Sequence, residues 1–371
     1  MSIAQERVDR YAGSADALLR QFHHLSELVG SSLLPNSRSR NPGDGVHPLL
    51  HLLGVAPHDT ERGELVEHLD AVVERWKNSP TFSTALLRRR VQPRLLRSRI
   101  EGVIEWRSLL NELRLRDCLE SRGVVATLTT SGPDIKIERG SDSAWLEVYN
   151  PMRSATEGYI SALLELCIDP SRPCLINWSF QEPEPPGVGS GDESQLIGKI
   201  EDVMRGMLPY TGTIQLSGRA TLCLDISEHS SIHVVKDEDS AGTSLTGLQD
   251  WLAGHITSKY SSMKNKFAQL SAASPSILVI DPSSSTGMTN QLSALVLGHP
   301  DPWGAFHWPA DLPPQCVGIL LWWYRLGTSE PWHAHLLVPR SAPSLPLWLQ
   351  DALDTTVIQV ADAQSSGGSP L

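Results

Sequence analysis

The stretch GPDIKIERGSDSAWLEVYN, residues 132–150, has the pattern of two β-strands joined by a polar turn. Apolar and polar side chains alternate on both sides of a connector at residues 138–143. Side chains two positions apart on a strand share a face, so Asp134 and Lys136 point the same way from the first strand. If the hairpin pairs across its turn, Glu147 of the second strand joins them. We therefore expect a face that carries two acids and a lysine.

Two carboxylates that lie a few ångström apart, both ionised at neutral pH, repel each other unless a cation lies between them. Asp134 and Glu147 are therefore candidate ligands of a divalent metal, and ligands that are all oxygen favour Mg²⁺ or Mn²⁺ over zinc. The alternative is an ordinary hairpin with solvated charges on one face and apolar side chains on the core.

Pro133 and Asp134 on one strand, followed by Glu147-x-Tyr149 on the next, resemble the signature of the PD-(D/E)XK nuclease-like superfamily. Tyr149 stands where the family has a lysine, which is thought to orient or activate the attacking water. A phenol, with a reference pKa of about 10, cannot replace an ammonium as an electrostatic stabiliser. Two interpretations are open. Either Lys136 supplies the cation from the neighbouring strand, as in some members of the family, or the site has lost its chemistry.

The elements before the hairpin agree with the core that this resemblance implies. Residues 99–123 show a helical apolar pattern that ends at Gly123, and residues 124–129 form a β-branched strand. The family places a helix before its first core strand, often with an acid that joins the metal site. Glu112 is our candidate for this additional acid, and Glu105 is the alternative. Both are also compatible with exposed charges on a helix.

After the hairpin, a helix at residues 157–166 leads to an apolar strand at 174–180, which predicts a βαβ crossover within one mixed sheet. A longer helix, residues 244–270, carries Lys259, Lys264 and Lys266 directly ahead of the buried-type strand at 276–281. This layout resembles that of other nuclease-like proteins, and its alternative is a solvated amphipathic face.

An arginine-rich run is the densest positive segment of an acidic chain. Its members are Arg88, Arg89, Arg90, Arg94, Arg97 and Arg99. One interpretation is a phosphate-binding patch, and the other is a helix face balanced by acids elsewhere, because arginine pairs with phosphate and carboxylate alike.

The composition limits the classes of function. The chain has 371 residues, 40% of them hydrophobic, which is enough for two or three domains with large cores. A net charge of −11 argues against a protein that coats nucleic acid indiscriminately, so nucleic-acid binding requires a local patch. The five cysteines form no Cys-x-x-Cys pair, which argues against a zinc ribbon or a disulfide framework.

The start of the chain lacks the apolar run of a signal peptide, and no window approaches eighteen continuous apolar residues. From this we predict a soluble, cytoplasmic protein without membrane contact.

Together these patterns predict an α/β fold, with a mixed central sheet flanked by helices, of the restriction-endonuclease type. We expect an N-terminal helical region (1–84), the nuclease-like core (85–281), and a C-terminal α/β extension (282–371) with a disordered Ser/Gly-rich tail. A third possibility is an unrelated α/β fold in which the hairpin is accidental.

The resemblance implies a nuclease that cleaves phosphodiesters, with DNA as the expected substrate and Mg²⁺ or Mn²⁺ as the cofactor. Asp134 and Glu147 would bind the metal, Lys136 would stabilise the developing charge, and Glu112 would be the additional acid. The alternative is a catalytically inactive nuclease-like fold that serves as a nucleic-acid-binding or scaffold module in a defence or repair assembly. A homodimer or a protein partner remains open in both cases.

Overall fold

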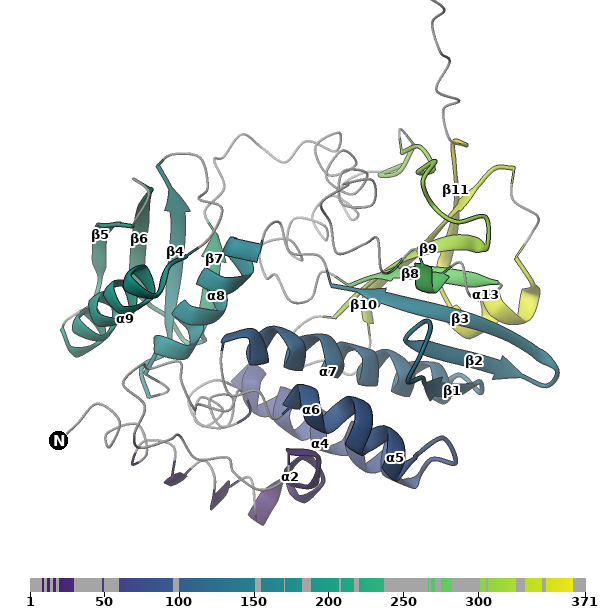
Figure 1. Ribbon diagram of the computed structural model, residues 1–371, viewed down its shortest axis with the longest axis horizontal. Coiled ribbons are helices and arrows are strands. Elements are labelled where there is room, and N and C mark those ends of the chain that lie inside the picture. Colours follow the sequence, from purple (N-terminus) through teal and green to yellow (C-terminus); the bar gives the residue numbers. More distant parts are fainter. Residues whose placement is uncertain are drawn as a thin grey trace, which may run out of the picture.

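A computed structural model gives the arrangement of the chain (Figure 1). It describes residues 9, 12–13, 16–17, 20–29, 49, 60–95, 100–150, 155–169, 171–181, 188–206, 208–216, 220–236, 266, 268–270, 275–281, 301–304, 306–324, 331–341 and 345–362.

The centre of the fold is a mixed seven-stranded sheet, here called the main sheet, with the order β1-β2-β3-β8-β9-β10-β11. Its strands are β1 (Val125–Leu128), β2 (Ile135–Arg139), β3 (Asp142–Tyr149), β8 (Ser276–Ile280), β9 (Cys316–Tyr324), β10 (Pro331–Pro339) and β11 (Thr356–Val360). The pairs β1–β2, β2–β3 and β9–β10 are antiparallel. The pairs β3–β8, β8–β9 and β10–β11 are parallel. The predicted α/β class with a mixed central sheet is confirmed.

The hairpin predicted at residues 132–150 is formed by β2 and β3. Its register pairs Ile135 with Leu146 and Arg139 with Asp142, so the turn is shorter than the predicted connector. Gly140 in this turn has a φ of 65°, in the left-handed region that glycine enters without steric cost.

The strand β8 lies next to β3 and is buried along its whole length, as expected for a parallel strand that is covered on both faces of its sheet. On β3, Leu146 and Val148 belong to the larger hydrophobic core. Tyr149 belongs to a second hydrophobic cluster, which includes Leu278 and Ile280 of β8. Glu147 alternates with Leu146 and Val148, and is fully buried.

The helix α7 (Ile100–Ser121) contacts β1 and three other helices, α4 (Thr60–Asn78), α6 (Gln92–Leu95) and α8 (Ala155–Cys167). The short helix α5 (Thr84–Leu86) and the π-helical turn η2 (Leu87–Val91) lead from α4 to α6. Figure 1 shows α7 running alongside β1–β3, with α4, α5 and α6 beyond it. Since α7 lies between other layers, even charged residues on it, including Glu112 and Arg116, are buried. The remaining helices of the described residues are α2 (His23–Val29), α9 (Ser190–Arg205) and α13 (Leu347–Leu353).

A second sheet of four strands has the order β5-β6-β4-β7. Its strands are β4 (Cys174–Phe180), β5 (Tyr210–Gln215), β6 (Thr221–Glu228) and β7 (His233–Lys236). The predicted strand at 174–180 is therefore present, but the prediction that it shares a sheet with the hairpin is wrong. The edge of β3 that it would have joined is paired with β8 instead, and β4 pairs with β6 and β7. The whole second sheet is inserted in the sequence between β3 and β8.

The strands after residue 282 continue the main sheet, because β9 pairs directly with β8. The expected boundary at this residue therefore does not separate two sheets. Most of residues 1–59, and all of the expected tail at 363–371, lie outside the described residues. None of the helices in the described ranges is both long and apolar enough to cross a membrane.

Candidate active site

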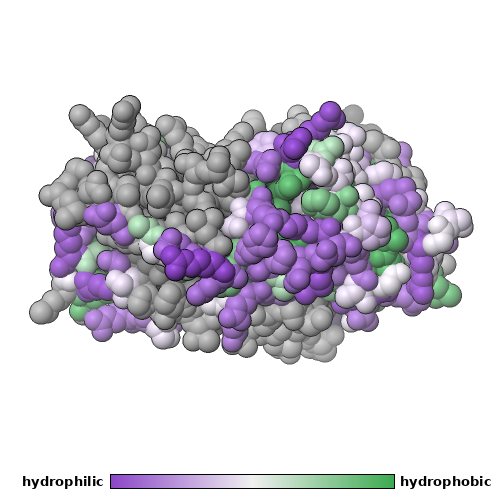
Figure 2. Space-filling model, turned by 90° about the horizontal axis from the view of Figure 1, so that it is seen from below, coloured by the Kyte–Doolittle hydropathy of each residue, from purple (hydrophilic) through white to green (hydrophobic). Residues whose placement is uncertain are grey.

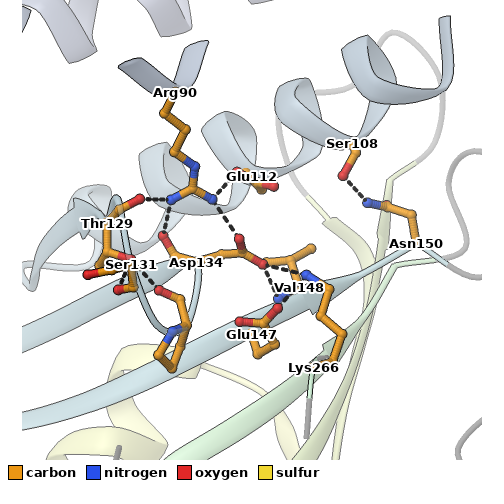
Figure 3. A network of polar contacts seen from close by, with 11 residues as sticks. Arg90, Ser108, Glu112, Thr129, Ser131, Asp134, Glu147, Val148, Asn150 and Lys266 are labelled. Atoms are coloured by element: carbon orange, nitrogen blue, oxygen red, sulfur yellow. Dashed lines mark hydrogen bonds and ion pairs between the residues drawn. The ribbon is translucent and has the colours of Figure 1, made fainter. Parts of the chain in front are cut away.

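Asp134 and Glu147 meet at the end of the hairpin, where both contact the ammonium of Lys266 (Figure 3). Asp134 comes directly before β2, and Glu147 is near the end of β3. Because Ile135 pairs with Leu146, the next pair along the hairpin brings Asp134 opposite Glu147. The Nζ atom of Lys266 lies 3.1 Å from Asp134 Oδ2 and forms a second ion pair with Glu147 Oε1. The expected convergence of the two acids near a positive nitrogen is present.

Asp134 is held on both of its carboxylate oxygens. Arg90 Nη2 donates to Oδ1 at 2.6 Å, and the backbone amide of Val148 donates to Oδ2 at 2.9 Å. Burial by itself raises the pKa of this acid, but the positive charges of Lys266 and Arg90 and the Val148 hydrogen bond outweigh it. The pKa of Asp134 is therefore lowered, and the residue is an anion at neutral pH.

The pKa of Glu147 is shifted in the opposite direction to that of Asp134. Burial, followed by repulsion from the Asp134 carboxylate, raises the pKa of Glu147 to about 8, although Lys266 opposes both effects. The side-chain amide of Gln269, with its nitrogen towards the acid, donates to Glu147 Oε1 at 2.6 Å and to Oε2 at 3.2 Å. Two buried carboxylates with divergent pKa values are typical of a functional site.

Lys266 and Gln269 belong to the helical residues just ahead of β8. They are three positions apart, so on a helix they face the same side. Burial lowers the pKa of Lys266, but Asp134 and Glu147 raise it by more, so the net shift is upward and the ammonium stays charged. Most of the predicted helix at 244–270 lies outside the described residues, but its last residues are helical and bring this lysine to the acids.

Glu112, the predicted additional acid, lies on α7 beside the hairpin and is 1% exposed. Arg90 Nη2 joins it to Asp134, at 2.7 Å from Glu112 Oε2. Glu112 therefore belongs to the same polar network as Asp134 and Glu147. Glu105, the alternative, lies almost two turns earlier on the same helix.

Lys136, the predicted cation, lies elsewhere. Its Nζ atom donates to Glu138 Oε1 at 2.6 Å and lies 5.6 Å from the ring centre of Trp145. The register of the hairpin explains this position, because Lys136 pairs with Trp145, two residues before Glu147 along β3. Two residues along a strand span about 7 Å, which moves the ammonium away from the two acids.

Tyr149, which stands at the lysine position of the family signature, is 8% exposed and packs in the second hydrophobic cluster. Its neighbours there include Leu278, Ile280 and Trp303. Its side chain therefore lies in an apolar environment.

The arginine run divides between the surface and the interior. Arg88 and Arg89 are exposed on the π-helical turn η2, whereas Arg90 turns inward to the acids. The backbone of Arg94 lies in α6 but its side chain is outside the described residues, as are Arg97 and Arg99 entirely. The predicted phosphate-binding patch is thus represented by two exposed arginines in the described part of the chain.

The charges of the network cancel only while Glu147 is protonated. Glu112, Asp134 and Glu147 are three acids, and Arg90 and Lys266 are two bases. When all five are ionised, one negative charge is left over in a buried place. A divalent cation would remove this excess and compete with Lys266 for the same oxygens.

Hard carboxylate oxygens are suited to Mg²⁺ or Mn²⁺. Within the described residues, no group of three His, Cys, Asp or Glu side chains is placed to hold a metal ion. Mg²⁺ commonly binds through one or two carboxylates, with water and phosphate oxygens completing its shell, so Asp134 and Glu147 fit such a site.

Access to the acids is greatest on the side of the lysine. The side chain of Lys266 is 23% exposed, compared with 11% for Arg90 and 8% for Asp134. A ligand would therefore meet the ammonium of Lys266 before it meets the carboxylates.

Comparisons with protein-family models, with curated proteins and with solved structures found no match.

Proposed function

We propose that this protein is a metal-dependent phosphodiester hydrolase of the restriction-endonuclease-like class, with DNA as its substrate. The observation that carries the proposal is the contact of one ammonium, that of Lys266, with both Asp134 and Glu147. Two acids and a lysine are the combination that the sequence signature implies, although the lysine comes from a different element.

The order of the elements supports the same class. The helix α7 is followed by three antiparallel strands, and β8 then pairs with β3 in parallel after a helical segment. The helix and the three strands that follow it have the order that the resemblance implies for the core.

In this proposal Asp134 and Glu147 hold Mg²⁺ or Mn²⁺, and Glu112 is an outer acid. A bound metal ion of this kind polarises a phosphoryl oxygen and lowers the pKa of a bound water. Lys266 stabilises the negative charge that develops on the phosphate, because its ammonium is both charged and the most exposed group of the network. Gln269 orients Glu147 through its two hydrogen bonds.

The exposed arginines give a route for the substrate. Arg88 and Arg89 lie on the same π-helical turn as Arg90, which contacts Asp134. A nucleic-acid backbone that binds these two guanidinium groups would be held by phosphate contacts that carry no sequence information.

A second candidate is a nuclease-like fold without catalytic activity that binds nucleic acid or acts as a scaffold. The feature that favours it is the ion pairing of Lys266 itself, because an ammonium on Asp134 Oδ2 and Glu147 Oε1 satisfies these acids without a metal. The two candidates differ in whether Mg²⁺ or Mn²⁺ displaces this ammonium.

The test is a cleavage assay on single- and double-stranded DNA and RNA with Mg²⁺, Mn²⁺ or EDTA. Asp134→Asn and Glu147→Gln should abolish cleavage, because each replaces a charged metal ligand by an amide of the same size. Asp225→Asn, on the exposed part of β6 in the second sheet, is the matched control. Metal-dependent cleavage that survives both substitutions would rule out this centre. A chain that neither binds Mg²⁺ or Mn²⁺ nor cleaves any of these substrates would favour the second candidate.

A further inference from the structure

We infer that Arg90 is a positioning residue that orients the Asp134 carboxylate, so that one oxygen is bound by the guanidinium and the other faces the metal. This inference rests on the proposed function, and it assigns a role to a residue that the sequence suggested only as one of several phosphate-binding arginines. Its basis is the set of contacts that the guanidinium makes within the network of Figure 3.

Each terminal nitrogen of Arg90 donates two hydrogen bonds. Nη1 donates to the backbone carbonyl of Asp134 at 2.9 Å and to that of Thr129. Nη2 donates to Asp134 Oδ1 at 2.6 Å and to Glu112 Oε2 at 2.7 Å. One side chain therefore fixes the backbone of Asp134, its carboxylate, the end of β1 and an acid of α7.

These contacts fix the plane of the Asp134 carboxylate and the direction of each of its oxygens. Oδ1 is turned towards Arg90, so Oδ2 is the oxygen that faces Lys266 Nζ and the amide of Val148. A metal that replaces or joins the ammonium would meet Oδ2. Arg90 thus acts through Asp134, and it has no direct contact with the ligand side of the site.

Arg90 also separates two acids. Glu112 and Asp134 bind the same nitrogen, and without a cation between them these buried carboxylates would repel each other. The planar guanidinium supplies several donors in fixed directions, whereas a lysine offers a single ammonium on a flexible stem. Lysine at this position would keep the charge but lose the orientation.

The local backbone explains how Arg90 reaches the interior. It lies on η2, a five-residue π-helical turn between the short helices α5 and α6. Such turns are rare in proteins, and those that occur are frequently found at functional sites. Here the turn leaves Arg88 and Arg89 exposed and directs Arg90 to the acids.

The experiment compares the full chain with its Arg90→Lys and Arg205→Lys variants, since Arg205 is an exposed arginine at the end of α9, in a different part of the fold. Mn²⁺ affinity is measured by electron paramagnetic resonance, and thermal stability by circular dichroism. Loss of a group that orients a metal ligand typically weakens metal binding by about 10- to 100-fold. We expect at least about a tenfold loss for Arg90→Lys, and no change for Arg205→Lys.

An unaltered Mn²⁺ affinity in folded Arg90→Lys would overturn the role of Arg90 and leave the proposed function intact. A wild-type chain that does not bind Mn²⁺ would overturn both. A purely structural role predicts a lower melting temperature without a change in the affinity of the folded protein.

If Arg90→Lys does not fold, Glu112→Gln gives the second test. Loss of the Glu112 charge leaves Arg90 to pair with Asp134 alone, so the anion becomes a weaker metal ligand and Mn²⁺ affinity should fall several-fold. Unchanged affinity in this variant would overturn the inference.

Discussion

Lys266 Nζ lies 3.1 Å from Asp134 Oδ2, although the two residues are 132 positions apart in the sequence. The positive charge that the nuclease-like signature requires on β3 is instead brought to the acids by the helical residues ahead of β8. Tyr149, which takes the signature position, is part of a hydrophobic cluster. Two acids and one ammonium therefore meet in this fold, although the lysine comes from a different element than the signature implies.

Replacement of Lys266 by methionine should reduce the rate of cleavage strongly, because it removes an ammonium that contacts both acids. Loss of a single preorganised electrostatic donor typically costs about 10²- to 10³-fold in rate. The rate is measured in single-turnover cleavage with saturating Mg²⁺. Lys136→Met is the matched control, since Lys136 pairs with Glu138. A larger loss of cleavage rate in Lys136→Met than in Lys266→Met would assign the stabilisation of the developing charge to Lys136 on β2.

The stability of the metal-free protein should depend on pH through Glu147. Its folded-state pKa, about 8, is above the ordinary value of 4.5, so the folded state binds the proton more tightly than the unfolded state. The stabilising contribution is complete below about pH 4.5 and is lost as the pH rises through about 8. In EDTA, we expect the urea concentration at the midpoint of unfolding to decrease as the pH is raised from 6 to 9.

Glu147→Gln is the control for this pH dependence, because the amide keeps the size of the side chain but does not titrate. The variant should show a flatter profile over the same range. An equally steep fall in Glu147→Gln would assign the effect to another group.

Divalent metal should stabilise the folded protein. At a concentration of about 100 times the dissociation constant, a ligand that binds only the folded state adds about 2.7 kcal/mol to the free energy of unfolding. The melting temperature of the wild-type chain should therefore rise with Mn²⁺, and the rise should be absent in Asp134→Asn. Calorimetry with Mn²⁺, Mg²⁺ and EDTA measures this. An equal rise in Asp134→Asn would place the metal elsewhere.

Affinity for DNA should depend on the two exposed arginines of η2. If Arg88 and Arg89 each contact one phosphate, the double alanine variant should reduce the slope of log affinity against log salt by about 2. Fluorescence anisotropy over a series of salt concentrations measures the slope. Arg205→Ala, an exposed arginine at the end of α9, is the control. The same slope in wild type and double variant would exclude these arginines from the interface.

The sequence predicts much of the local structure, because its signals are short-range. The alternation at residues 132–150 predicts the β2–β3 hairpin, and the apolar runs at 174–180 and 276–281 predict β4 and β8. The faces of the hairpin follow from the same alternation, which is why Asp134 and Glu147 could be placed together. Glu112 could be selected only through the family resemblance, because a buried helical acid has the same local pattern as an exposed one.

The remaining features depend on contacts that are distant in the sequence. Periodicity does not state which sheet a strand joins, so the place of β4 in the second sheet could not be derived. The inward direction of Arg90 depends on the π-helical turn, which has no recognised sequence signal in this run of arginines. The sequence predicts the helix that carries Lys266. The contact of Lys266 with Asp134, however, depends on the parallel pairing of β3 with β8.

The insertion of the second sheet between β3 and β8 has a consequence for biosynthesis. Translation produces both acids of the hairpin well before it produces Lys266, and the strands β4–β7 are made in the interval. A nascent chain that ends anywhere in this interval has the carboxylates but lacks their ammonium and the strand that pairs with β3. Under the proposed function, hydrolytic competence therefore arises only after the ribosome has passed β8.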